Sequence, residues 1–210
     1  MTLYIIRHGE TELNRQNIVQ GSGVDSNLNN TGRRQAQLFY QYYRTVKFDL
    51  VLTSALKRTH QTVEPFILRG GVEVMNMPEL NEISWGVHEG KVGDLASAAS
   101  YKTMINHWQS ENYDARIEGG ESAAELAIRV SSIITFLKNN HHKYTNVLLC
   151  THGRTLLCLL TLMNEMPLRD MNFFKHNNTC LYKCHFVDGE FIFELENDLK
   201  HLGNLPTAGF

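Results

Sequence analysis

Short apolar runs alternate with amphipathic helical stretches along this chain of 210 residues. Strand signals lie at Leu3–Ile6, Phe48–Thr53, Val72–Met75, Asn146–Thr151, Thr179–Val187 and Glu190–Glu194. Helical patterns lie at Thr31–Val46, Ala55–Leu68, Leu95–Gln109, Ala123–Asn140 and Arg154–Met163. The run from Val147 to Cys150 is apolar throughout, as expected for a strand that is covered on both faces. This alternation predicts a mainly parallel sheet with helices on both faces.

Local signals refine the expected fold. The last two strand signals flank Asp188-Gly189, a dipeptide that favours a two-residue hairpin turn. Ser122 and Glu125 have the spacing of a capping box and mark the clearest helix start. We therefore expect a three-layer α/β/α fold. Its mixed sheet should have about six strands, mainly parallel, and an antiparallel C-terminal hairpin should close it.

Composition limits the classes of protein that fit. A chain of 210 residues suits one domain, 1–210, with a short lid-like segment at about 95–118. The net charge of −2 gives no reason to expect nucleic acid or a membrane surface as a partner. No apolar stretch approaches the roughly 18 residues of a membrane span. The oligomeric state stays open between a monomer and a homodimer.

The cysteines indicate a reducing compartment. Cys150, Cys158, Cys180 and Cys184 form no CxxC pair. A zinc site built from Cys180, Cys184 and His185 is disfavoured, because adjacent residues of a strand point in opposite directions. We expect reduced structural thiols and, without a leader sequence, a cytoplasmic protein.

Polar side chains follow three of the predicted strands at the points where they end. These segments are Arg7-His8-Gly9, Thr53-Ser54 followed by Arg58, and Thr151-His152-Gly153. The carboxyl ends of parallel strands share one edge of a sheet, where ligands bind, so all three segments should converge. Arginine forks fit phosphate oxygens, and a neutral histidine is a nucleophile for phosphorus. The amide of Gly153, at a helix start, favours an anion.

Transfer of a phosphoryl group to a histidine also needs an acid to protonate the leaving oxygen. The segment Pro78–Gly86 follows the third strand and holds two carboxylates, Glu79 and Glu82. The spacing alone does not choose between them.

Several motifs together carry a resemblance to a known family. Arg7-His8-Gly9-Glu10-Thr11, followed by Asn14 and Gln20-Gly21, resembles the opening signature of the histidine phosphatase superfamily, the phosphoglycerate mutase-like proteins. The family's further motifs are similar, in the same order, to Thr53–Thr62, Glu79–Gly86 with Glu89-Gly90, Gly119–Ser122 and Thr151–Gly153.

The resemblance implies a role for each matching position. His8 would be the nucleophile that becomes a phosphohistidine, and Glu82, not Glu79, the proton donor. Arg7, Arg58 and His152 would clamp the phosphate without any metal or other cofactor. The substrate side would be lined by Thr11, Asn14, Gln20 and Gly21, with Gly153 at the phosphate.

The chain departs from the family pattern at several positions. Arg154 stands where a glycine is usual, and Leu157 stands where an arginine is frequent. Arg154 either adds charge near the ligand or points to solvent. Asn27-Leu28-Asn29 replaces a Pro-Leu-Thr before the first long helix, where asparagine would still serve as a cap.

The segment from Leu95 to Glu118 bears on the reaction type. The family's mutases have a longer insertion here, with two arginines for a substrate carboxylate, whereas this chain offers only Arg116. Its other large side chains either pack a helix on the core or form a partly apolar lid: Tyr101, Met104, Ile105, Trp108 and Tyr113.

We therefore expect a metal-independent phosphatase for a small phosphomonoester such as α-ribazole phosphate or a sugar phosphate. A cofactor-dependent phosphoglycerate mutase and a non-catalytic phospho-ligand-binding protein are the alternatives.

Overall fold

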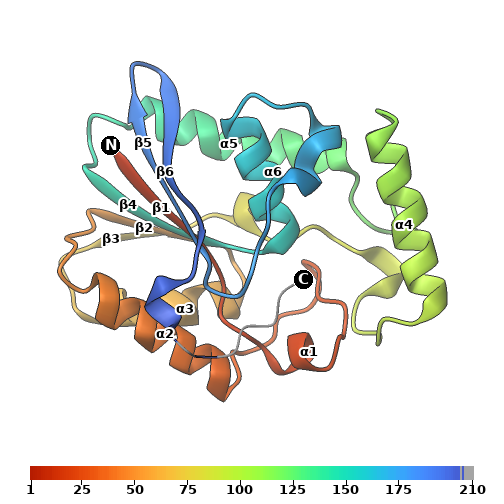
Figure 1. The fold of residues 1–210 in the computed structure, drawn as a ribbon, viewed down its shortest axis with the longest axis horizontal. Coiled ribbons are helices and arrows are strands. Elements are labelled where there is room, and N and C mark those ends of the chain that lie inside the picture. Colours follow the sequence, from red (N-terminus) through yellow and green to blue (C-terminus); the bar gives the residue numbers. More distant parts are fainter. Residues whose placement is uncertain (204, 206–210) are drawn as a thin grey trace.

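A six-stranded sheet runs through the middle of the computed structural model, which describes residues 1–203 and 205 (Figure 1). Its strands are β1 (Thr2–Arg7), β2 (Leu50–Thr53), β3 (Glu73–Asn76), β4 (Asn146–Thr151), β5 (Leu181–Val187) and β6 (Glu190–Asp198). Their order in the sheet is β3-β2-β4-β1-β5-β6. The first four pair in parallel, β5 runs antiparallel to β1, and β6 forms a hairpin with β5. The predicted fold class is confirmed.

Helices cover both faces of this sheet. The α-helices are α1 (Glu12–Arg15), α2 (Asn30–Tyr43), α3 (Lys57–Leu68), α4 (Leu95–Gln109), α5 (Ala123–Asn139) and α6 (Gly153–Met163). Short 3-10 turns lie at η1 (Pro78–Leu80), η2 (Gly86–His88), η3 (Leu168–Phe173) and η4 (Lys200–Leu202). In Figure 1, α2 and α3 lie on one face, α5 and α6 on the other, and α4 stands at one side of the molecule.

The alternation of side chains along β4 divides the core between the two faces. Leu148 packs on the same side as Phe39 of α2, and its neighbour Leu149 packs with Leu126 and Leu156 of α5 and α6. All five side chains are fully buried. Both faces of this strand are therefore dry, which explains why its sequence carries no polar alternation.

Most predicted elements are present, with shifted ends. Strand β5 begins at Leu181 rather than at Thr179, because Thr179 has a left-handed backbone (φ 56°) and the turn before the strand closes on Cys180. Strand β6 continues to Asp198, beyond the predicted Glu194. The one-turn helix α1 was not predicted, since four residues show no helical period.

The predicted caps are confirmed. Ser122 and Glu125 form the capping box at the start of α5. Asn29 caps α2 by accepting a hydrogen bond from the Gly32 amide at 2.8 Å. Asp188 and Gly189 both have positive φ, as a tight hairpin turn requires.

The register of the sheet places the ends of β1, β2 and β4, which the candidate site residues follow, side by side. Strand β4 lies between β1 and β2, with Arg7 opposite Thr151 and Thr53 opposite Cys150. The residues that follow these strands therefore emerge at one edge, as the sequence predicted.

Three observations concern membrane spanning and metal binding. In the described part of the chain no helix is both long and apolar enough to cross a membrane, and no group of three or more His, Cys, Asp or Glu residues is placed to hold a metal ion. The His185 ring contacts Glu194 and Thr2, whereas the neighbouring Cys184 is buried in the core.

The substitution Leu149→Ala tests the position of the core. Because this side chain is fully buried at the centre of the sheet, its truncation should lower the free energy of unfolding by about 2–5 kcal/mol. Urea unfolding measures this change. The matched control is Ile128→Ala on the surface of α5, where the side chain is 74% exposed. A loss at Leu149 no larger than the loss at Ile128 would contradict the assigned core.

Candidate active site

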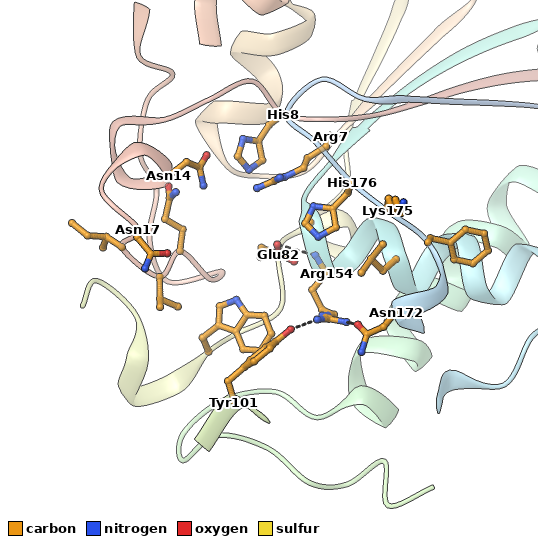
Figure 2. Close-up of a pocket in the computed structure, with 17 residues that line it drawn as sticks. Arg7, His8, Asn14, Asn17, Glu82, Tyr101, Arg154, Asn172, Lys175 and His176 are labelled. Atoms are coloured by element: carbon orange, nitrogen blue, oxygen red, sulfur yellow. Dashed lines mark hydrogen bonds between the residues drawn. The ribbon is translucent and has the colours of Figure 1, made fainter. Parts of the chain in front are cut away.

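A cavity of about 600 Å³ opens where β1 and β4 end. Figure 2 shows the side chains that converge on it from the end of β1 and the loop after it, from α4 and the segment before it, from the start of α6, and from η3 and the stretch after it. The labelled residues that line it are Arg7, His8, Asn14, Asn17, Glu82, Tyr101, Arg154, Asn172, Lys175 and His176.

His8 is held rigidly at the end of β1. Its amide donates to the Thr151 carbonyl at 2.9 Å, and its carbonyl accepts from the Asn178 side chain at 3.0 Å. The ring Nδ1 lies 2.7 Å from the Gly9 carbonyl oxygen. A carbonyl only accepts, so Nδ1 carries the proton of the neutral ring. The lone pair is therefore on Nε2, which is the nitrogen left for nucleophilic attack.

The surroundings of His8 keep it uncharged. Burial, followed by the positive charges of Arg58 and Arg7, holds the pKa of His8 well below its ordinary value. The neutral ring is therefore the prevailing form of His8 at neutral pH. Arg7 itself is only 5% exposed and lines the same cavity.

Arg58 and His152 form a buried chain of hydrogen bonds. The Arg58 Nε donates to His152 Nδ1 at 3.0 Å, so the proton of the neutral His152 ring lies on Nε2. That nitrogen donates to the Ser54 hydroxyl at 2.8 Å, which lies 2.9 Å from the Thr59 hydroxyl. Thr59 donates in turn to the Leu56 carbonyl.

This chain places Arg58 and His152 behind the wall of the cavity. Both are fully buried, and neither is among the described residues that line the cavity. The His152 ring centroid lies 5.1 Å from that of His8. Burial lowers the pKa of Arg58 to about 10, which leaves it cationic at neutral pH. Direct contact of these two residues with a phosphate stays a prediction.

Glu82 sits across the start of α6. Its Oε1 accepts from the Ile83 amide at 3.0 Å and from the Thr155 amide and hydroxyl at 3.0 and 3.1 Å. Its Oε2 accepts from the Arg154 amide at 3.1 Å. The crowding of Oε1 marks Oε2 as the oxygen with room for a proton. The helix start expected to receive phosphate therefore also binds a carboxylate.

The loop that carries Glu82 is anchored by Arg129. This arginine binds both carboxylate oxygens of Glu121, at 2.6 and 2.8 Å, and donates to the carbonyls of Glu79 and Asn81. The Asn81 carbonyl also accepts from the Thr155 hydroxyl. Glu79 contributes its backbone to this clamp and does not line the cavity, so of the two carboxylates left open by the sequence only Glu82 reaches it.

The predicted substrate-side residues divide into two groups. Asn14 and Gln20 line the cavity. Thr11 is fully buried and caps α1, where it accepts hydrogen bonds from the Asn14 amide and the Gln20 side chain. The Gly21 carbonyl accepts from Arg58, and a Cβ at Gly21 would lie 2.0 Å from Glu89 Oε1. Thr11 and Gly21 therefore support the wall from behind.

Glycine at position 9 has a packing role. A Cβ here would lie 2.7 Å from the Gly32 carbonyl of α2. A Cβ on Gly32 would in turn lie 2.0 Å from the Glu10 carbonyl. The two glycines let α2 approach the backbone after His8.

Arg154 points into the cavity rather than to solvent. It is 7% exposed, and its guanidinium donates to Asn172 Oδ1 at 2.8 Å and to the Tyr101 hydroxyl. The guanidinium carbon lies 5.8 Å from the ring centroids of both Tyr101 and Trp108. Of the two alternatives that the sequence leaves open, the structure excludes the one in which Arg154 points to solvent.

Helix α4 packs on the core and also reaches the cavity. Met104, Ile105 and Trp108 are buried and pack on the core. Tyr101 lines the cavity and forms an edge-to-face pair with Trp85, with ring centroids 5.5 Å apart. The cavity therefore has one aromatic wall.

Sequence reasoning missed several residues of the site. Asn178 fixes the backbone of His8, while Asn172, Lys175 and His176 line the cavity. Asn172 belongs to η3 and the other three to the stretch between η3 and β5, and neither segment carries a motif. Only the return of β5 beside β1 brings them to the site, and local sequence gives no signal of that contact.

Comparison with known proteins identifies the family. Residues 3–199 match the model of the histidine phosphatase superfamily (branch 1). The chain belongs to the histidine phosphatase superfamily. Adenosylcobalamin/alpha-ribazole phosphatase of Escherichia coli (strain K12) is 32% identical over 183 residues, which are 86% of this chain and 87% of that protein.

Two other members of the superfamily have different names. The probable phosphoglycerate mutase GpmB of Photorhabdus laumondii is 29% identical over 211 residues, which are 96% of this chain and 95% of that protein. The structure of phosphoserine phosphatase from Entamoeba histolytica in complex with 3-phosphoglyceric acid superposes with a TM-score of 0.80 at 26% identity. It covers 96% of this chain and 98% of that one. The superfamily membership is thus shared by proteins with different named activities.

Buried histidines should make the stability of this histidine phosphatase pH-dependent. Burial lowers the pKa of His176 to about 3 and of His201 to about 4, and holds His8 and His152 well below their ordinary values. Below pH 6.5 the unfolded chain binds protons that the folded protein does not, so stability falls as pH falls. The slope should approach about 1.4 kcal/mol per pH unit for each histidine.

Urea unfolding between pH 7 and pH 5 measures this slope. The variant His201→Gln, outside the cavity, should reduce it by the share of one histidine. Equal stability at the two pH values would refute the assignment of neutral buried rings.

Proposed function

We propose that this chain hydrolyses small phosphomonoesters through a phosphohistidine formed on Nε2 of His8. The observation that carries the proposal is the orientation of the His8 ring. Its Nδ1 is bound to the Gly9 carbonyl at 2.7 Å, so the free lone pair lies on Nε2 in a cavity shared with Arg7 and Glu82. A nucleophile, a cation and a carboxylate in one cavity supply what phosphoryl transfer requires.

In the first step, His8 Nε2 attacks phosphorus while the bond between phosphorus and the alcohol oxygen breaks. Glu82 donates a proton from Oε2 to the leaving alcohol. The positive charge of Arg7, reinforced by Arg58 behind the ring, stabilises the transferring phosphoryl group. The resulting phosphohistidine keeps its Nδ1–H bond to the Gly9 carbonyl, which spreads the charge that develops on the ring.

In the second step, water replaces the alcohol. Glu82, now ionised, accepts a proton from the water as it attacks phosphorus, and the bond between phosphorus and Nε2 breaks. Phosphate leaves, and His8 and Glu82 return to their starting protonation states. His8 and Glu82 keep the same positions in both steps. The proposal also includes a role for Arg58 and His152 in holding the phosphoryl group.

Water is the better acceptor than a second alcohol. The resemblance assigns the substrate carboxylate of the mutases to two arginines of the 95–118 segment, whereas Arg116 of this chain binds Glu125 at 2.7 and 2.8 Å and does not line the cavity. Alpha-ribazole phosphate, phosphoserine and sugar phosphates are the substrate candidates. Conversion of 3- to 2-phosphoglycerate in a coupled assay, faster than phosphate release, would favour the mutase instead.

We also propose a cytoplasmic location. The four cysteines are buried and free, and burial raises the pKa of Cys158 and Cys184 to about 12. Protonated, enclosed thiols suit a reducing compartment.

Trapping of the intermediate tests the nucleophile. Brief reaction with p-nitrophenyl phosphate, followed by alkaline quench, should give an acid-labile phosphohistidine on His8. Phosphorus NMR should assign it to Nε2. His8→Ala should form none and lose phosphate release by at least about 10⁴-fold, as expected when a nucleophile is removed. Phosphate on Nδ1, or full activity of His8→Ala, would refute the mechanism.

Two isosteric substitutions test the choice of acid. Glu82→Gln should lower kcat for alkyl phosphates by about 10²–10⁴-fold, because an alkoxide leaves poorly without a proton. The loss should be smaller for p-nitrophenyl phosphate, whose leaving group needs little protonation. The matched control, Glu79→Gln, should stay within about twofold of the unchanged protein. Equal losses in the two variants would reject Glu82 as the acid.

A further inference from the structure

We propose that Arg154 is the centre of a second anion subsite in the cavity. The preferred substrates would then be phosphomonoesters whose alcohol part carries another negative group, a carboxylate or a second phosphate. This inference rests on the proposed phosphatase function and adds a substrate class to it.

The first observation is a buried cation with neutral partners. The guanidinium of Arg154 is bound by the Asn172 amide oxygen and the Tyr101 hydroxyl, and within the described residues it forms no ion pair with a carboxylate. The contrast is Arg129, whose side chain is more exposed, at 20%, and binds both oxygens of Glu121. A buried charge without an opposite charge is costly. An anionic ligand in the cavity would supply that charge for Arg154.

The second observation is where Arg154 lies. In Figure 2, Arg7 and His8 lie on one side of the cavity, and Arg154 lies toward the opposite side with Tyr101 and Asn172. A phosphoryl group at His8 would direct the alcohol part toward that opposite side. The volume of about 600 Å³ leaves room for a substantial alcohol.

The third observation is the composition of the cavity wall. Its lining includes three cationic side chains, those of Arg7, Arg154 and Lys175, and one carboxyl group, that of Glu82, which the proposed mechanism uses to carry a proton. One phosphoryl group at Arg7 leaves the positive charges of the outer wall unmatched. A substrate with a second anionic group places a negative charge beside Arg7 and another beside Arg154, whereas a substrate with a neutral alcohol part leaves Arg154 without a counter-charge.

The guanidinium of Arg154 is held in one orientation before any ligand binds. Hydrogen bonds to Asn172 and Tyr101 hold it, and the aromatic rings of Tyr101 and Trp108 lie on its flanks at 5.8 Å. A planar fork fixed in this way offers its remaining N–H groups in one geometry, which favours the planar oxygens of a carboxylate or the face of a phosphate. The Tyr101 hydroxyl accepts from Arg154, so its own proton can be donated to the same ligand.

Matched substrate pairs test the subsite. Glycerol 3-phosphate and 3-phosphoglycerate differ at one end by a carboxylate, and fructose 6-phosphate and fructose 1,6-bisphosphate differ by a phosphate. The unchanged protein should have a kcat/KM about 10- to 100-fold higher for the anionic member of at least one pair, the range expected for hydrogen bonds to a charged group. The pair with the larger ratio identifies the anion.

Substitution should remove the preference. Arg154→Met should bring the ratio close to one, mainly through a higher KM for the anionic substrate. Tyr101→Phe, which keeps the arginine but removes one of its partners, should lower the ratio less. The matched control is Arg116→Met, an arginine paired with Glu125 outside the cavity lining, and its ratio should not change.

The outcomes separate the two proposals. No preference in the unchanged protein, or an equal loss for both members of a pair in Arg154→Met, would overturn the subsite while the phosphatase stands. An equal loss would place Arg154 at the transferring phosphoryl group or in the packing of α4. Failure to release phosphate from any of these compounds and from p-nitrophenyl phosphate would overturn the phosphatase itself.

Discussion

Positive charge is buried at the carboxyl edge of the sheet, and the rest of the site depends on it. Arg7 and Arg58 lie beside His8 with almost no exposure to solvent. Burial, followed by the positive charges of the two arginines, holds the pKa of His8 and of His152 well below the ordinary value, so both rings stay neutral. In the proposed function, a dianionic phosphoryl group balances the charge of the arginines. The same positive charges then help to keep the proposed nucleophile, His8, unprotonated.

The fold supplies this arrangement through strand order. Because β4 lies between β1 and β2, the residues after three strands meet without any long loop. The side chains then organise one another: Arg58 orients His152, and Arg129 holds the loop of Glu82. Arg129 is not among the residues that line the cavity, so the position of Glu82 is fixed in part from outside it.

Much of this could be predicted from the sequence, for physical reasons. Periodicity and apolar runs located the strands and helices because burial acts locally along each element, as in β4. The convergence of Arg7, Arg58 and His152 followed from the rule for parallel strand ends. The hydrogen-bonded chain that joins Arg58, His152 and Ser54 could not be predicted, because it depends on how buried side chains from separate strand ends meet. The contribution of Asn178 and its neighbours depends on the antiparallel return of β5, a contact between distant segments.

The main chain and the side chain of Arg154 make different contacts. Its main-chain N–H binds Glu82 Oε2, and every amino acid except proline can make that bond. Its side chain, in contrast, extends into the cavity. A different side chain at position 154 would therefore change the lining of the cavity and leave the main-chain bond to Glu82 in place. The start of α6 in this way lets the substrate preference that we propose vary independently of the proposed acid.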